Sequence, residues 1–499
     1  RKEQRLMSLR HRNGGAMRKF KRAMALTLVT AMAAASFVGC SKNSSSGSAA
    51  ANNATKEVVT DASGKEVPLR DQIAAKKYDS EGKVLNIYVW NDEFINRVAD
   101  HFPGYEKVDA TNGKIGDVSV KFTKVDNQDN KYQTNLDQTL QDNGDNQENA
   151  DADKKIDIFL VEADYALKYV NSKYTTKLAD LGITDADLPN QYQYTKDAVT
   201  DSEGNLKGIS WQGCPGLLIY RRDIAKEVLG TDDPAEVQKS VADWDKFADT
   251  AKMMAAKNYK MTSSVNDTYR VFSNNVTSKW VDENNVINVD DNIKKWVDMS
   301  KAMVDAKQTD THALWSDDWA KGFYETGNVF CYFGPAWLID FSMHCDEKGS
   351  VGYDGGWAVT EGPQGFFWGG TWICAAAGTD NQELVKDLML CLTTDEETMT
   401  QIVEKDHDFV NNSKVMEAKA TDSSFGDKYL SNQNPVGLFC NGIKTVSLAN
   451  ISGYDQGCNE EFQNAMKDYF DGNYKTYEDA LDAFYTKVIV KYPELKKPE

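Results

Sequence analysis

The sequence predicts an α/β fold, because strand and helix patterns alternate along the chain. Residues 83–90, KVLNIYVW, and residues 117–126, DVSVKFTKVD, alternate apolar and polar side chains as half-buried strands do. A helical pattern follows over residues 130–141. A third strand pattern, KKIDIFLVEAD, covers residues 154–164. We therefore expect a sheet covered by helices.

The rest of the chain has mainly helical patterns. Residues 240–243 resemble a capping box, and residues 291–307 place apolar side chains on one stripe at helical spacing. Residues 328–333 form a short strand pattern, and residues 365–378 form an apolar strand interrupted by Gly369 and Gly370. Further helices are expected from Asp380, from Thr394 and over residues 478–489.

Length and composition indicate a large globular protein with an acidic surface. The chain has 499 residues, enough for two or three domains, and contains 11 Trp, 22 Tyr and 20 Phe. Its net charge is −19, but residues 1–40 carry nine Lys or Arg and one Glu, so the remainder carries −27. Such a surface repels nucleic acid and anionic lipid headgroups. We expect no nucleic-acid partner.

The N-terminal region has the order of a secretory leader. From Met17, four cations precede an apolar run that ends in Phe37-Val38-Gly39-Cys40, which resembles a bacterial lipobox. We expect residues 17–39 to be cleaved and Cys40 to receive lipid such as palmitate, which would hold the protein on a membrane. The alternative is a first transmembrane helix, but the apolar stretch is shorter than the roughly 20 residues of a span.

The segments on either side of the leader are also assigned from sequence. Residues 1–16 precede the natural start at Met17 and are expected to be translated upstream sequence. Residues 40–82 are rich in Ser, Ala, Asn and Gly at their start, and we expect a lipid-anchored flexible tether there. Folded sequence is then expected from about Lys83.

Cysteine usage favours free thiols over a disulfide scaffold. Seven cysteines remain beside Cys40, an odd number, and none forms a CxxC pair. Several stand in apolar runs, where cysteine packs as a small hydrophobe. The seven are Cys214, Cys331, Cys345, Cys374, Cys391, Cys440 and Cys458.

The sequence contains no recognisable catalytic or metal-binding motif. Four histidines follow the leader, and each is isolated, without an HExxH pattern: they are His101, His312, His344 and His407. His344 and Cys345 are adjacent, but two ligands do not make a zinc site. No GxSxG, P-loop or GxGxxG motif accompanies a strand–turn–helix pattern. We therefore expect no catalytic residue, cofactor or metal. The chain has 76 carboxylate residues, so their number does not exclude a glycosidase pair, but no sequence pattern locates one.

Aromatic residues instead stand beside planar polar residues at strand and loop ends. Sugars present hydroxyl groups that bond to carboxylates and amides, and apolar faces that stack on aromatic rings. The first cluster follows a predicted strand, at the sheet edge where α/β proteins bind ligands. The candidate ligand-binding residues are Trp90, Asn91, Glu93, Glu162, Asp164, Tyr165, Trp211, Gln212, Asp267, Trp337, Trp368, Gly370, Thr371 and Asp455.

From about Lys83 to its end, the chain resembles the extracellular solute-binding proteins related to maltose-binding protein, the sugar-binding lipoproteins of carbohydrate ABC transporters. The resemblance rests on the leader and on blocks that follow one another in the family's order. These are DIFLVEADYALKYV, VADWDKFADTAK, ETGNVFCYFGPAWL, WGGTWICAAAGTDNQELVKDLMLCLTTDEE and EDALDAFYTKV. The FGPAWL block followed by the WGGTW strand is the most specific of them.

The resemblance implies a two-lobed periplasmic-binding-protein-like fold of type II, hinged by crossover strands. Carried onto this sequence, lobe 1 covers residues 83–212 and 371–430, and lobe 2 covers residues 213–370 and 431–499. The crossovers fall near residues 213–216, 368–370 and 431–436. The ligand is expected in the cleft between the lobes.

The function implied is that of the extracytoplasmic component of an ABC importer, which binds a mono- or oligosaccharide and delivers it to the permease subunits. Glu93, Glu162 and Asp164 are expected to bond to sugar hydroxyls with Trp90 and Gln212, and Trp337 and Trp368 to supply stacking faces. The protein is expected to be a lipid-anchored monomer on the outer face of the cell membrane, and not an enzyme.

Two other classes stay open at the level of sequence. A lipid-anchored glycan hydrolase would need two carboxyl groups about 5–9 Å apart across one cleft. A binding protein for peptides, amino acids or polyamines would use acidic clusters and aromatic walls, which suit a cation.

Overall fold

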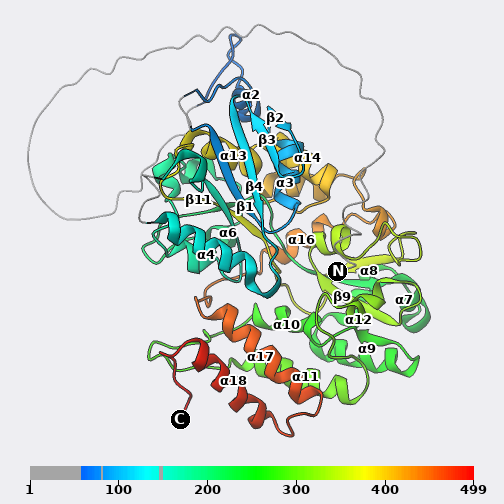
Figure 1. The fold of residues 1–499 in the computed structure, drawn as a ribbon. Helices are drawn as coiled ribbons and strands as arrows, with labels where there is room; N and C mark the ends of the chain where they lie inside the picture. Colours follow the sequence, from blue (N-terminus) through cyan, green and yellow to red (C-terminus); the bar gives the residue numbers. More distant parts are fainter. Residues whose placement is uncertain (1–57, 80–81, 145–149) are drawn as a thin grey trace, which may run out of the picture. The chain divides into compact units, whose positions relative to one another are not determined.

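The computed structural model describes residues 58–79, 82–144 and 150–499. Residues 58–67 form a separate unit, in which Thr60 and Glu66 make an isolated bridge. Residues 68–499 form one unit with a seven-stranded and a four-stranded sheet (Figure 1). The expected leader, Cys40 and the first part of the expected tether lie outside the described residues.

The seven-stranded sheet is built around the three predicted N-terminal strands. β1 (Val84–Val89) lies between β4 (Val118–Lys124) and β5 (Ile158–Glu162) and runs parallel to both. On the far side of β5, β11 (Thr371–Ala375) and β6 (Ile209–Ser210) continue the sheet in antiparallel pairing. β3 (Asn112–Ile115) and β2 (Tyr105–Lys107) complete the other edge. The alternating α/β pattern is confirmed.

The four-stranded sheet has the order β10-β7-β9-β8. Its strands are β7 (Leu217–Arg221), β8 (Lys260–Thr262), β9 (Val329–Gly334) and β10 (Trp357–Thr360). β7, β9 and β10 are buried along their whole length, because helices and loops cover both faces. Only β8 runs parallel to its neighbour β9.

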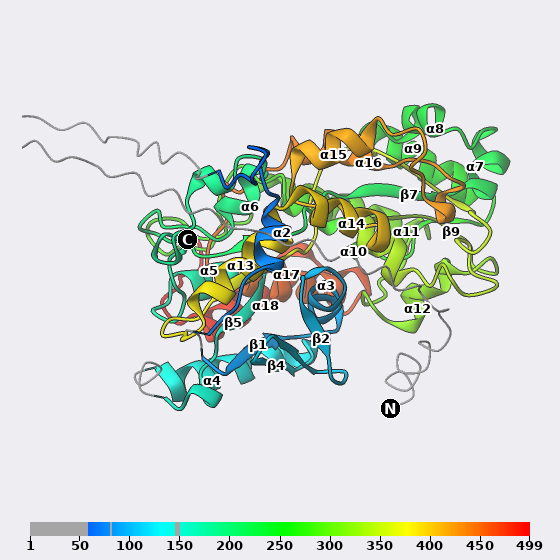
Figure 2. The same cartoon turned by 90° about the horizontal axis from the view of Figure 1, so that it is seen from above.

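Helices from both halves of the chain pack on the seven-stranded sheet. α3 (Glu93–His101), α13 (Gln382–Thr394) and α14 (Glu396–Asp406) form one group beside β1 (Figure 2). α4 (Lys131–Gly144) is fixed by Tyr132, whose hydroxyl donates to the carbonyl of Leu160 in β5 at 2.7 Å. The short helix α5 (Ala166–Val170) follows β5, and the short helix α6 (Gln193–Asp197) precedes β6.

Residues 68–79 correct the expectation of a flexible tether as far as Gly82. α2 (Leu69–Ala74) begins after Pro68 and packs on α13, burying Ile73. The Tyr78 hydroxyl donates to Asp387 Oδ2 in α13 at 2.9 Å, and Lys76 pairs with the same carboxylate at 2.7 Å. The folded unit therefore begins at about Pro68, because these side chains have partners on α13.

A second group of helices surrounds the four-stranded sheet and continues beyond it. α7 (Arg222–Leu229), α8 (Pro234–Val241), α9 (Trp244–Ala256) and α10 (Asn266–Ser273) contact its strands. α11 (Asp291–Asp305), α17 (Asp455–Phe470) and α18 (Tyr477–Lys491) pack together around Trp296 and Phe484 (Figure 1). α12 (Asp317–Ala320), α15 (Ser413–Ala420) and α16 (Val436–Ile443) are the remaining helices of the described chain. None of the described helices is both long and apolar enough to span a bilayer.

The chain passes from one sheet to the other through two paired segments. Residues 211–216 lead from β6 to β7, residues 361–370 lead from β10 to β11, and Pro215 bridges Phe367 between them. The predicted interruption of the strand at Gly369 and Gly370 is confirmed, since both have positive φ and β11 begins only at Thr371. Two chain crossings therefore lie side by side.

The expectation of buried free thiols is confirmed for the seven cysteines outside the leader. Cys214, Cys331, Cys345, Cys374, Cys391, Cys440 and Cys458 are all buried and unpaired. Burial raises the pKa of the Cys374 and Cys391 thiols, which keeps them protonated and unreactive.

Asp157, at the entry to β5, joins three segments in the interior. It is fully buried and accepts hydrogen bonds from the backbone N–H of Asn86 at 2.7 Å, from the Thr379 hydroxyl at 2.6 Å and from the Asn381 amide at 3.1 Å. The Asn381 amide also donates to the carbonyl of Val84 at 2.9 Å. This network attaches the start of α13 to β1 and β5.

Replacement of Asp157 by Ala should lower the free energy of unfolding by about 2–4 kcal/mol, because several buried donors lose their acceptor. Urea unfolding monitored by circular dichroism measures the change. Asp117→Ala, at an exposed position before β4, is the matched control and should change stability by less than about 0.5 kcal/mol. Equal effects of the two substitutions would contradict this role for Asp157.

Candidate functional site

Three segments that are distant in sequence meet at one edge of the seven-stranded sheet. Trp90 directly follows β1, and Glu162 is the last residue of β5. Because β1 and β5 are parallel, both residues lie at the same edge of the sheet. β11 is antiparallel to β5 and places Thr371 directly opposite Glu162. Carboxyl ends of strands in such sheets are the usual position of ligand sites.

Gln212 connects the polar residues at this edge. Its amide donates to Glu93 Oε1 at 3.2 Å and to Asp408 Oδ2 at 2.9 Å, and its carbonyl oxygen accepts from the Thr371 backbone N–H at 3.0 Å. Asn91 accepts from the Glu93 backbone N–H at 3.0 Å, which orients the start of α3. Asp408 was not predicted, because nothing in its local sequence distinguishes it from other acids.

Trp211 lies behind this network. Its ring is fully buried, and its indole N–H donates to Asp408 Oδ2 at 3.2 Å. It stacks on Phe94 with ring centroids 5.5 Å apart. The structure therefore places Trp211 in the core, where it supports Asp408 and offers no exposed face.

Three tryptophans gather next to Glu162. The Trp337 and Trp368 rings lie 5.0 Å apart at 66°, and Trp315 stacks on Trp337 at 6.1 Å and 27°. Trp315 is 56% exposed, the most open of the three. A side chain at Gly369 would begin 3.5 Å from the Trp337 ring and 3.9 Å from Glu162, so glycine allows this close approach. Gly370, which follows at φ 111°, turns the chain into β11.

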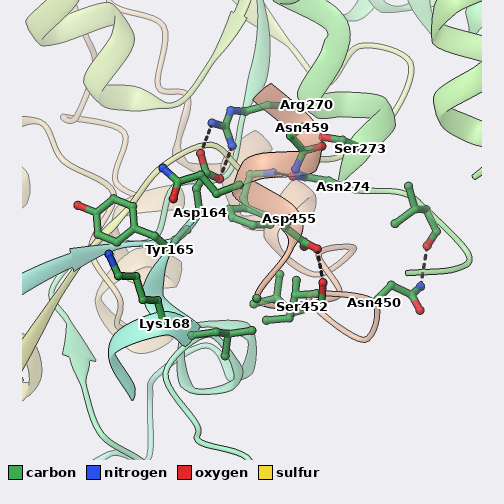
Figure 3. A pocket seen from close by; sticks show the side chains of 18 of the residues that line it. Asp164, Tyr165, Lys168, Arg270, Ser273, Asn274, Asn450, Ser452, Asp455 and Asn459 are labelled. Carbon is green, nitrogen blue, oxygen red and sulfur yellow. Dashed lines mark hydrogen bonds and ion pairs between the residues drawn. The ribbon is translucent and has the colours of Figure 1, made fainter. Parts of the chain in front are cut away.

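A cavity of about 560 Å³ has Asp164, Arg270 and Asp455 among the residues that line it (Figure 3). α4 and α5 line one side of it, and α10, α17 and the loop over residues 445–456 line the other. Its volume is within the range of small-molecule sites. Three of the predicted residues, Asp164, Tyr165 and Asp455, line this cavity, and the Tyr165 ring points away from Asp455 (Figure 3).

Arg270 joins the two sides of the cavity. Its guanidinium donates two bonds to Asp164, at 2.9 Å and 2.6 Å (Figure 3). It also lies over the Trp368 ring, 5.7 Å from the centroid, and so links the cavity to the tryptophans. Asp164 follows a strand of the seven-stranded sheet, whereas Arg270 is on α10, which packs on β9. This ion pair holds the two parts together.

Asp455 keeps hydrogen-bonding capacity toward the cavity, whereas the Tyr165 hydroxyl lies in the interior. The buried Tyr165 hydroxyl has no hydrogen-bond partner among the described residues. Asp455, at the start of α17, accepts from the Ser452 hydroxyl at 2.8 Å. A carboxyl group such as that of Asp455 can bind the hydroxyls of a bound molecule.

The remaining predicted residues lie elsewhere. Asp267 is 7% exposed and accepts from the Trp319 indole at 2.7 Å and from the Ser264 backbone N–H at 2.8 Å, so it fixes the start of α10 and does not line the cavity. Trp90 is half-buried and packs edge-on against Tyr132 at 5.3 Å.

Burial changes the charge of the acids at the site. It raises the pKa of Glu162 to about 8, with a contribution from the neighbouring Asp164 charge, and raises the pKa values of Glu93 and Asp455 to about 7. Burial acts on Asp164 in the same direction, but Arg270 outweighs it and lowers that pKa. At neutral pH Asp164 is therefore charged, and Glu162 is mostly protonated and able to donate a hydrogen bond.

Fold and site geometry define a two-lobed binding protein, and comparison with protein families identifies its class. The profile of the bacterial extracellular solute-binding proteins matches residues 108–423, and the chain belongs to this family. Comparison with curated proteins gives no match.

Solved structures of the same two-lobed architecture confirm the expected fold. A crystal structure of an extracellular solute-binding protein of family 1 has a TM-score of 0.63 at 20% identity and covers 81% of this chain and 99% of its own. The ABC-transporter-associated binding protein of B. animalis subsp. lactis Bl-04, in complex with beta-1,6-galactobiose, has a TM-score of 0.63 at 15% identity and covers 84% and 100%. The galacto-N-biose/lacto-N-biose I-binding protein of Bifidobacterium longum has a TM-score of 0.61 at 14% identity with the same coverage.

The raised pKa of Glu162 predicts a pH dependence of stability. Because the folded state holds this proton more tightly than the unfolded chain, the side chain stabilises the fold at low pH and loses this contribution as pH rises from about 4.5 to about 8. Glu162→Gln removes the titration. The free energy of unfolding of this variant should therefore rise relative to wild type across that window.

Urea titrations between about pH 5 and pH 9 measure the difference at each pH. Glu106→Gln, at an exposed position in β2, is the matched control and should run nearly parallel to wild type. If the free energy of unfolding of Glu162→Gln also ran parallel to that of wild type across this pH range, burial would not raise the pKa of Glu162.

Proposed function

We propose that this protein is the extracytoplasmic solute-binding component of a carbohydrate ABC importer, which binds a neutral mono- or oligosaccharide and delivers it to the permease. Membership of the solute-binding family supports the role of carrier. Relatives of the same architecture are described as complexes with beta-1,6-galactobiose, lacto-N-biose and maltose. In this proposal the sugar occupies the 560 Å³ cavity and extends toward the three tryptophans.

The chemistry of the cavity wall carries the proposal. Amide, hydroxyl and carboxyl groups line it, and Arg270 on its wall lies over the Trp368 indole ring, so hydrogen-bonding groups and a nearby aromatic face suit sugar hydroxyls and apolar sugar faces. Its charged residues balance as three acids and three bases: Asp137, Asp164, Asp455, Lys168, Arg270 and Lys491. A polyamine would favour uncompensated acids, so the balance supports a neutral ligand.

We propose that lobe 1 comprises residues 83–212 and 371–430 and lobe 2 residues 213–370 and 431–499, moving about the crossovers. The last residues of the first lobe, Lys428–Leu430, pack on β10 and so lie against the second sheet. A ligand that contacts Asp164 and Asp455 together would favour the closed arrangement through its higher affinity for it.

We further propose that the protein is a monomeric lipoprotein held on the outer face of the cell membrane. This rests on the sequence pattern of a leader over residues 17–39, lipid such as palmitate on Cys40 and a tether that ends at about Pro68.

A glycan hydrolase is the second candidate, and the contacts of the site acids count against it. Both Asp164 oxygens are occupied by Arg270, and Glu93 accepts from Gln212. A retaining or inverting hydrolase requires one acid free to attack or to activate water and another free to donate a proton. Incubation with oligosaccharides should accordingly release no product.

A thermal-shift screen tests the ligand class. A neutral saccharide present at about 100 times its dissociation constant should add about 2.7 kcal/mol to the free energy of unfolding and raise Tm. Mono- and disaccharides, including galactosides and glucosides, are compared with spermidine and short peptides. A Tm rise with spermidine or peptides alone, or turnover of a glycan, would overturn the proposal.

Trp337→Ala should weaken binding of the saccharide found in that screen by about tenfold or more, because an aromatic stacking face is lost. Trp337→Phe keeps a ring and should retain most of the affinity, which separates stacking from a general loss of folding. Tyr353→Ala, at a side chain 49% exposed in the second sheet's outer loop, is the matched control. Isothermal titration calorimetry gives the three affinities, and unchanged binding by Trp337→Ala would exclude the ring from the site.

A further inference from the structure

Asp340, His407 and Asp427 meet beside the crossing segments although they are far apart in sequence. His407 Nδ1 and Asp340 Oδ1 are 2.9 Å apart, and one ligand atom from each of the three residues lies within 4.8 Å of the other two. Two ligands on opposite sides of one metal ion are about 4–5 Å apart, since each bond is about 2.0–2.5 Å long. The three side chains can therefore share one ion.

Local structure fixes the backbone of each of these residues. His407 ends α14 in the left-handed region, at φ 52°. Asp340 lies in the turn Leu338–Ser342, which directly follows Trp337. Asp427 bridges Gln433, whose side-chain amide bonds to both the N–H and the carbonyl of Val359 in β10. The donors are thus presented by parts of the chain that are held in place.

A small cavity of about 20 Å³ is lined by all three residues. This volume holds a single water molecule or ion. Asp408 also lines it, is 5% exposed, and has an Oδ1 atom without a hydrogen-bond partner in the described part of the chain. The other described residues around the cavity are apolar, and His407 is the sole basic side chain among them.

This surrounding makes a bound cation favourable. Carboxylates that are removed from water require a compensating positive charge or proton. Asp408 has Arg97, at 3.4 Å from its Oδ2, but neither Arg nor Lys lines the cavity among the described residues. An ion in the cavity would supply positive charge beside Asp340 and Asp427, where His407 is the sole basic residue of the described lining.

We propose that Asp340, His407 and Asp427 form a site for a divalent transition-metal ion, with Zn²⁺ as the best match. One imidazole and carboxylate oxygens suit Zn²⁺, whereas Ca²⁺ and Mg²⁺ prefer oxygen ligands alone. Three protein ligands leave a fourth position for water, as in a tetrahedral zinc site. The site is separate from the 560 Å³ cavity, shares no lining residue with it and does not depend on the proposed sugar function.

Metal binding by the tag-free, metal-stripped chain tests the proposal. Calorimetric titration with ZnCl₂, with the bound metal counted by elemental analysis, should show one Zn²⁺ per chain. Asp340→Asn and His407→Gln should weaken binding by at least about tenfold. His344→Gln is the matched control, since His344 is exposed and pairs with Glu347 at 3.2 Å, and it should bind as wild type does.

Two results would overturn the site. One is absence of stoichiometric Zn²⁺ binding by the wild-type chain, which would mean that a proton shared by the acids is enough to compensate their buried negative charge. The other is equal binding by all variants, which would place the ion elsewhere. A second measurement needs no variant: the visible spectrum of the Co²⁺-substituted wild-type chain should show nitrogen and oxygen ligation. A thiolate charge-transfer band would instead show that a cysteine binds the ion, and would contradict the proposed ligands.

Discussion

The hydrogen bonds of Gln212 are the constraint on which the site depends. Its side chain reaches Glu93 at the start of α3, Asp408 after α14 and the backbone of Thr371 at the start of β11. These contacts hold the ends of three segments together at the point where the chain leaves the first sheet for the second. Because Gln212 is 3% exposed, the bonds form away from competing water and are correspondingly strong.

The same burial reduces the negative charge of the acids around the proposed sugar site, although the chain as a whole is strongly acidic. Removal from water raises the pKa values of Glu93, Glu162 and Asp455, so that much of their negative charge is lost near neutral pH. Asp164 keeps its charge, but Arg270 compensates it. The charge that these acids carry near the proposed site is therefore small, which agrees with the proposed neutral ligand.

The sequence predicted those parts of the fold and site that follow from local patterns. The strands around β1 and β5 were predicted because apolar residues alternate there, and Glu162 and Asp164 were expected at the sheet edge because they end one of these strands. Arg270 and Trp315 were missed, since only the packing of α10 brings Arg270 to the cavity and only the turn before α12 brings Trp315 against Trp368. Trp211 and Asp267 were predicted to bind ligand, but both are buried. An aromatic or acidic residue beside polar neighbours has the same local sequence whether it faces a ligand or the interior, so the sequence could not separate the two cases.

His407 shows why a residue that is isolated in sequence can belong to a cluster. Its partners, Asp340 and Asp427, come from segments attached to the second sheet, whereas His407 and Asp408 follow α14, which packs on α3 of the first. Contacts of this kind are set by the crossing of the chain between sheets and leave no spacing pattern. An ion bound by these residues would hold both sheets near the crossover, so any movement that separates the lobes there would change its affinity. If a ligand between the lobes changed the affinity for the ion by some factor, thermodynamic linkage would require that the ion change the affinity for that ligand by the same factor.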